Sequence, residues 1–130
     1  MNRRTCLKTV ALAGVGALPV AAQKSKPPIQ LHVDLDVDPS KEKDLLAAYR
    51  THFRPAISKQ PGFVEVKLMK MVSAVVGAPP AHTSYRLLIS FQTEDQRKTW
   101  VATPTHQEVW PKMEANLKGD KYTAALFQVV

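Results

Sequence analysis

Several side chains suited to binding and proton transfer lie close together in the last third of the sequence. Thr103-Pro104 predicts a helix start, after which His106, Trp110 and Met113 follow at spacings of four and three residues. Side chains at such spacings share one face of a helix. Trp100 comes just before this start. The helical region therefore presents two indoles beside one imidazole, a group that can accept a proton near neutral pH.

Two residues on predicted strands could complete such a site. Arg86 is a candidate for holding an anion and His32 for moving a proton. Each has a structural alternative. Arg86 could be an ion-pair residue at an interface, and His32, followed on its face by Asp34 and Asp36, could lie on a solvated surface. His106 could likewise be an edge histidine, and the two tryptophans could be core aromatics.

Metal chemistry finds little support in the sequence. The four histidines are scattered, and no His-x-x-His or His-Glu-x-x-His spacing is present. The single cysteine, Cys6, lies in the N-terminal segment that we expect to be removed. The remaining sequence then has no thiol for a disulfide or a thiolate ligand. We expect no metal site.

The N-terminal segment has the composition of a signal peptide. The apolar region that follows Lys8 is too short to span a bilayer as an ordinary helix. The small residues that end this segment at Ala22 favour cleavage after that position. We therefore predict a signal peptide over 1–22, a flexible tether over 23–28 and one folded domain over 29–130.

The basic residues of this segment suggest the export route. Arg3 and Arg4, followed by Leu7 and Lys8, resemble a twin-arginine signal. Cys6 stands where a larger apolar residue is more usual, so the general secretory route remains the alternative. We expect a periplasmic or secreted protein that is free of the membrane after cleavage.

Removal of the leader also changes the charge. The number of Lys and Arg residues falls from 18 to 15 while all 11 acidic residues stay, so the formal net charge drops from +7 to +4. The remaining basic residues are interleaved with acidic and apolar ones. This pattern is typical of solvated faces and disfavours a nucleic-acid-binding patch.

The elements that position the candidate residues begin with the segment 29–37. Its strict alternation of apolar and polar residues predicts a strand with one face in an apolar core. A helix should start at 38–40 and restart or kink near Pro55, which has no backbone N–H. The helix stripe expected to lie on the sheet comprises Leu45, Leu46, Tyr49, Phe53 and Ile57.

Two further strands are predicted at 63–71 and 85–91, joined by a turn-rich segment at 73–82. Apolar residues near the tip of this connection suggest contact with another subunit. Thr93 opens a capping box and a second helix, which restarts at Thr103 and carries apolar positions up to Leu117. The last strand is expected at 122–130.

The predicted order βαββαβ indicates an α+β, ferredoxin-like fold, a four-stranded antiparallel sheet with two helices on one face. The other face needs cover, because the strand at 63–71 is apolar on both sides. Phe63, Met69 and Met71 are predicted to lie on that open face. A homodimer through the open sheet face is the simplest cover, and it would form a dimeric α/β barrel.

The span 29–129 resembles the dimeric α/β-barrel superfamily, and within it the antibiotic biosynthesis monooxygenase domains. The resemblance rests on the first strand followed by DPSKEKDLLAAY, the QPGF turn, and the run ISFQTEDQRKTWVATPTHQEVW. It implies a pocket between sheet and helices for a small aromatic or quinol-type compound. In cofactor-independent oxygenases of this type the pocket favours the deprotonated substrate, and that anion reduces dioxygen.

The resemblance also sorts the candidate residues. The catalytic candidates are His106, Arg86 and His32, and the substrate-binding candidates are Trp100, Trp110 and Met113. The haem-degrading branch of the superfamily needs a histidine where this chain has Trp110, so haem is disfavoured and no cofactor is expected. The alternative function is a non-catalytic homodimeric binding or stress-response domain that holds a small apolar ligand.

Replacing Arg3 and Arg4 together by Lys tests the export route. If twin-arginine export carries the chain, this variant should leave the precursor in the cytoplasm, because that route reads the arginine pair. Immunoblots of periplasmic and cytoplasmic fractions would measure the distribution. Unchanged export would assign the chain to the general secretory route instead.

Overall fold

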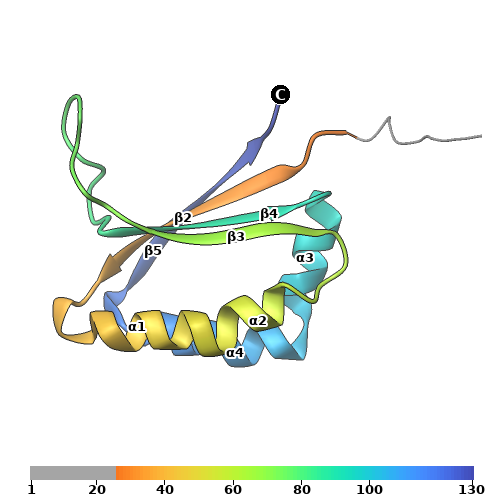
Figure 1. The fold of residues 1–130 in the computed structure, drawn as a ribbon, viewed down its shortest axis with the longest axis horizontal. Helices are drawn as coiled ribbons and strands as arrows, with labels where there is room; N and C mark the ends of the chain where they lie inside the picture. The colour runs from red at the N-terminus through yellow and green to blue at the C-terminus, as the bar shows by residue number, and fades with distance from the viewer. Residues whose placement is uncertain (1–25) are drawn as a thin grey trace, which may run out of the picture.

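The computed structural model describes residues 26–130. The predicted signal peptide and the first part of the predicted tether lie outside the described residues. The strands are β2 (Ile29–Val37), β3 (Phe63–Lys70), β4 (Tyr85–Phe91) and β5 (Leu117–Gln128). A helical region follows β2, and α3 (Glu94–Ala102) and α4 (Pro104–Glu114) follow β4. The predicted order of elements is therefore confirmed (Figure 1).

The four strands form one sheet in the order β3-β4-β2-β5, and each neighbouring pair runs antiparallel. The helices lie against one face of this sheet (Figure 1). Along β2 the apolar residues of the alternating pattern turn toward the helices, and Val33 and Leu35 are buried among them. The predicted fold class is confirmed as α+β and ferredoxin-like.

The first helical region is continuous but changes its winding. A 3-10 turn (Pro39–Lys41) is capped by the Asp38 side chain, which accepts a hydrogen bond from the backbone N–H of Ser40 at 2.9 Å. The region continues through α1 (Glu42–Ala48), a π-helical turn (Tyr49–Phe53) and α2 (Arg54–Ile57). The predicted irregularity near Pro55 thus takes the form of a change of winding just before it, since a residue without an N–H interrupts the regular α-helical ladder.

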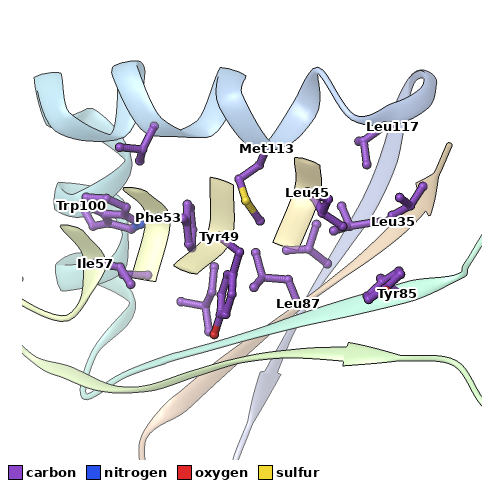
Figure 2. Close-up of a cluster of buried hydrophobic side chains, with 14 of the residues drawn as sticks. Leu35, Leu45, Tyr49, Phe53, Ile57, Tyr85, Leu87, Trp100, Met113 and Leu117 are labelled. Carbon is purple, nitrogen blue, oxygen red and sulfur yellow. The ribbon is translucent and has the colours of Figure 1, made fainter. Parts of the chain in front are cut away.

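The core lies between this helical region and the sheet (Figure 2). Leu45, Phe53 and Ile57 are almost completely buried against Leu35 and Leu87 of the sheet. The predicted stripe is confirmed at these positions and at Tyr49, while Leu46 is only half-buried. Burial of each large apolar side chain contributes about 1.5–3 kcal/mol to folding, so this stripe fixes the helices to the sheet.

A bulge at the start of β3 corrects one prediction. Phe63 pairs with Phe91, but Glu65 pairs with Ser90, so β3 carries one extra residue there. The extra residue turns Phe63 to the helix side, where its ring meets that of Phe91 at 6.1 Å. The prediction that Phe63 lies on the open face is therefore wrong. Met69 does lie on that face and is 37% exposed.

Two predicted boundaries also change. The last strand begins at Leu117 and not at residue 122, so Leu117 belongs to β5 and not to the second helical region. The strand β3 ends at Lys70, and no regular structure follows until β4. This connection projects from the sheet on the side away from the helices (Figure 1). Val75 and Val76 near its tip are at least 90% exposed.

The predicted capping box at the start of α3 is present. Thr93 Oγ1 accepts from the backbone N–H of Gln96, and Gln96 Oε1 accepts from the backbone N–H of Thr93, both at 3.1 Å. The Gln96 amide lies directly over Gly62, where an added Cβ would meet Oε1 at 1.9 Å. Gly62 also has φ +80°, so both the backbone and the cap require glycine there.

Gly62→Ala should therefore destabilise the fold by more than Gly77→Ala. Both glycines have positive φ, but nothing lies near a Cβ at Gly77, so only the first change also displaces Gln96 from its cap. We expect an excess loss of about 1 kcal/mol in the free energy of unfolding, the usual value of a cap. Urea denaturation would measure it. The excess should vanish in a Gln96→Ala background, and its persistence there would contradict this explanation.

Candidate functional site

A cavity of about 200 Å³ lies between the sheet and the helices, on the β5 side of the core. Its helical wall is formed by Phe53, Arg97, Trp100, Val101, His106 and Trp110. Its sheet wall is formed by Leu31, Val33, Ile89, Tyr122 and Ala124. The wall is mostly aromatic and aliphatic, as in most small-molecule sites. Tyr122 is 41% exposed, so the cavity reaches solvent beside β5.

His106 stands on the first turn of α4 between the two indoles. Thr103 caps this helix by accepting from the backbone N–H of His106 at 3.1 Å. The imidazole meets the Trp100 ring edge-on at 5.1 Å and is nearly parallel to the Trp110 ring at 6.3 Å. Its Nδ1 atom is buried and has no hydrogen-bond partner within the described residues. A buried nitrogen without a partner is costly, so a ligand that bonds to it would relieve that cost.

Burial lowers the pKa of His106 below its usual 6.5, and the positive charge of Arg97 lowers it further. The imidazole is therefore neutral at neutral pH. A neutral imidazole has one nitrogen that accepts a proton, so the ring can act as a base toward a molecule in the cavity.

Arg97 is a wall residue that the sequence analysis did not select. Its Nε and Nη2 donate to the two carboxylate oxygens of Glu94, each at 2.6 Å. The pair lies one helical turn apart on α3, and each partner shifts the pKa of the other so that both stay charged. The capping box at Thr93 was the sequence signal that could have pointed to Arg97. It fixes the start of α3 and hence the helix face on which Arg97 lies.

The structure brings three of the predicted site residues together. Trp100, His106 and Trp110 all line the cavity. Met113 does not line it, although its spacing is right, because it turns into the core and is only 1% exposed. The expected place of Met113 in the pocket is therefore wrong.

The other two candidates lie on the opposite face of the sheet. Arg86 donates to both carboxylate oxygens of Asp34 at 2.6 and 3.1 Å, which raises the pKa of the arginine. His32 Nε2 donates to Gln30 Oε1 at 3.1 Å, and the imidazole ring packs at 4.8 Å from the ring of Phe127. The sheet thus separates both from His106, and the expectation that either one walls the same cavity is wrong for this subunit. The alternative interpretation of Arg86, as an ion-pair residue, agrees with its contact with Asp34.

Other kinds of site find no support in the part of the chain that the structure describes. Within residues 26–130, no three His, Cys, Asp or Glu side chains gather closely enough to hold a metal ion. Over the same residues, no helix combines the length and apolar character needed to cross a bilayer.

Comparison with known proteins finds solved structures with a similar fold. No protein-family model and no curated protein matches the sequence. A candidate antibiotic biosynthesis monooxygenase from Bordetella bronchiseptica superimposes with a TM-score of 0.66 at 20% identity, over 81% of this chain and 99% of that one. A variant of SnoaB, a cofactor-independent oxygenase from Streptomyces nogalater, gives 0.63 at 14% identity, over 79% and 93%.

A dimeric ferredoxin-like protein of unknown function from a Jannaschia species gives a TM-score of 0.65 at 14% identity, over 78% of this chain and 99% of that one. This chain shares its ferredoxin-like fold with these three proteins. At such identities the likeness concerns the fold, and the activity must be argued from the cavity.

The lowered pKa of His106 predicts how stability depends on pH. Its pKa is lower in the folded chain than the usual 6.5, so the unfolded chain binds the proton more tightly. The free energy of unfolding should therefore fall as the pH drops from about 6.5 toward the folded-state pKa.

A glutamine side chain does not bind a proton in this pH range. The variant His106→Gln should therefore show a weaker dependence of the free energy of unfolding on pH. Urea denaturation at several pH values between 7.5 and 5 would measure both proteins. Identical pH dependence in the two proteins would show that His106 is not held neutral by the fold.

Proposed function

We propose that this chain is an exported, homodimeric monooxygenase-like enzyme that oxidises a small phenol or quinol without a bound cofactor. The observation that carries the proposal is the cavity wall, where a neutral imidazole with an unpartnered Nδ1 stands between two indoles. Flat aromatic walls suit a flat aromatic substrate, and the imidazole supplies a base at its edge.

The size of the cavity limits the substrate. An engineered protein cavity of about 150 Å³ holds one benzene ring. The cavity of about 200 Å³ therefore suits a single substituted ring or a compact pair of fused rings. Larger polycyclic compounds would have to extend past Tyr122 into solvent.

The proposed reaction begins with proton transfer. The phenolic hydroxyl gives its proton to Nδ1 of His106, and the resulting phenolate is electron-rich enough to reduce dioxygen. One oxygen atom becomes a new carbonyl on the ring, and the other leaves as water with two hydrogens from the substrate, so the product is a quinone. The surrounding indoles exclude water and orient the ring.

Dimerisation is part of this proposal, through the sheet face that the helices leave open. Met69 lies exposed on that face. The connection from β3 to β4, which carries the exposed Val75 and Val76, projects on the same side (Figure 1). Large exposed apolar groups of this kind mark interaction surfaces. The structural neighbour from a Jannaschia species is described as dimeric.

A non-catalytic binding domain is the second candidate. Apart from His106, Arg97 and the Tyr122 hydroxyl, the side chains of the cavity wall are apolar or indole rings. Such a wall would hold an apolar ligand without any reaction.

His106→Ala tests the catalytic proposal. Oxygen consumption with a panel of phenols and quinols should fall by about hundredfold or more, the usual contribution of a general base. The melting temperature should change little, because the ring is only half-buried. Met113→Leu, a change in the core outside the cavity, is the control and should keep its activity.

The oxygen-consumption assay, combined with a measurement of phenol binding, separates the two candidate functions. Binding of phenols in the absence of any oxygen consumption would support the binding domain. Activity per folded molecule that is unchanged in His106→Ala would contradict the role proposed for the histidine.

Met69→Asp tests the dimer. A charge on the open sheet face should shift the protein from dimer to monomer in sedimentation experiments. Arg86, the cross-strand neighbour of residue 69, is already paired with Asp34, so the added carboxylate would be buried at the interface as an excess charge. Ala47→Glu places the same charge on the exposed face of α1 and should leave the dimer intact. A wild-type protein that sediments as a monomer would contradict the proposal.

A further inference from the structure

Arg97 is the charged side chain in the wall of the cavity. Its side chain is mostly buried, with 18% exposed, and it lies between an ion-pair partner and the cavity. On one side it is paired with the carboxylate of Glu94, which does not line the cavity. On the other side it borders the space where a ligand would lie.

The pairing leaves donors of the guanidinium available. An arginine carries five N–H groups in a planar fork. Glu94 takes one from Nε and one from Nη2. Within residues 26–130 these are the hydrogen bonds that the Arg97 guanidinium makes, so the N–H groups of Nη1 remain for another acceptor.

The carboxylate also holds the guanidinium in place. Two short parallel hydrogen bonds fix the orientation of the fork, so Arg97 would not need to reorganise when a ligand binds. An oxygen anion that entered the cavity would meet a preoriented donor in mostly apolar surroundings, where charge-assisted hydrogen bonds are strong.

We propose that Arg97 binds the ionised hydroxyl oxygen of the ligand, and that the cavity therefore selects aromatic compounds with an acidic hydroxyl over the corresponding ethers. The inference rests on the proposed function only in using the same cavity. It assigns to Arg97 the anion-binding role that the sequence suggested for Arg86. His106 would accept the proton, and Arg97 would hold the oxygen that released it.

A purely structural role for Arg97 makes a different prediction. If the Glu94–Arg97 pair only stabilised the first turns of α3, loss of either partner would have the same consequence. If Arg97 contacts the ligand, the two losses have different consequences. Removing the arginine removes the donor, whereas removing the glutamate leaves a cation whose charge is no longer neutralised.

The test compares 4-nitrophenol with 4-nitroanisole, which have the same ring and nitro group but differ in the ionisable hydroxyl. Equilibrium binding is measured at a pH where free 4-nitrophenol is about half ionised, and the phenolate absorption band reports the bound form. Wild-type protein should bind 4-nitrophenol at least about tenfold more tightly than 4-nitroanisole, and in the phenolate form.

Arg97→Gln should abolish this preference while its affinity for 4-nitroanisole stays within about twofold of wild type, which also shows that the variant is folded. Glu94→Gln should keep or increase the preference, because the glutamine oxygen can still accept a hydrogen bond from the guanidinium while the charge of Arg97 is no longer neutralised. Equal losses in the two variants would overturn the proposal in favour of a structural role. Equal binding of the two compounds by the wild-type protein, or binding of neither, would also overturn it.

This experiment is independent of turnover. Neither probe needs to be oxidised, so a protein that consumes no oxygen could still show the selectivity. Conversely, an active enzyme with no preference for 4-nitrophenol would refute the role of Arg97 and leave the proposed oxidation standing.

Discussion

The buried indole of Trp100 joins the packed core to the cavity. It is only 1% exposed, meets Phe53 edge-on at 6.0 Å on one side and meets His106 at 5.1 Å on the other. Its place is fixed by α3, whose start depends on the capping box and on the glycine beneath it. Trp100 is therefore both a core side chain and part of the cavity wall. A rigid wall of this kind is what a small binding site needs, because positions fixed by packing and caps cost little to organise when a ligand arrives.

The open face of the sheet has a different character. It carries an ion pair between Asp34 and Arg86, the imidazole of His32 packed against Phe127, and the exposed Met69. Mixed polar and apolar groups of this kind suit a surface that is covered by a second subunit and still soluble without it. Pairing of two such faces would leave the two cavities on the outer, helix-covered sides of the sheets. Each subunit would then hold its own site.

Periodicity and capping signals were enough to predict the fold. The alternation of β2 and the capping box of α3 are patterns within short stretches of sequence, so they could be identified without knowledge of the tertiary structure. The orientation of Phe63 could not be read in this way, because a single extra residue in β3 reverses the face of every side chain before it. The site was predictable in part. His106 and Trp110 share a face of α4, and Trp100 lies on α3 just before it. Arg97 was not selected from the sequence. His32 could have been excluded, since the polar positions of β2 must point away from the face on which the helices pack.

The most direct test of this cavity as the working site is a nitrogen-detected NMR titration of the imidazole of His106 with 2-naphthol in the absence of oxygen. Among residues 26–130 the Nδ1 atom has no hydrogen-bond partner, and it is buried beside the two indoles. The naphthol hydroxyl should therefore move the Nδ1 resonance, and the indole N–H signals of Trp100 and Trp110 should shift at the same ligand concentration. Unchanged signals from all three rings while other residues respond would show that the ligand binds elsewhere and that the cavity is not the site.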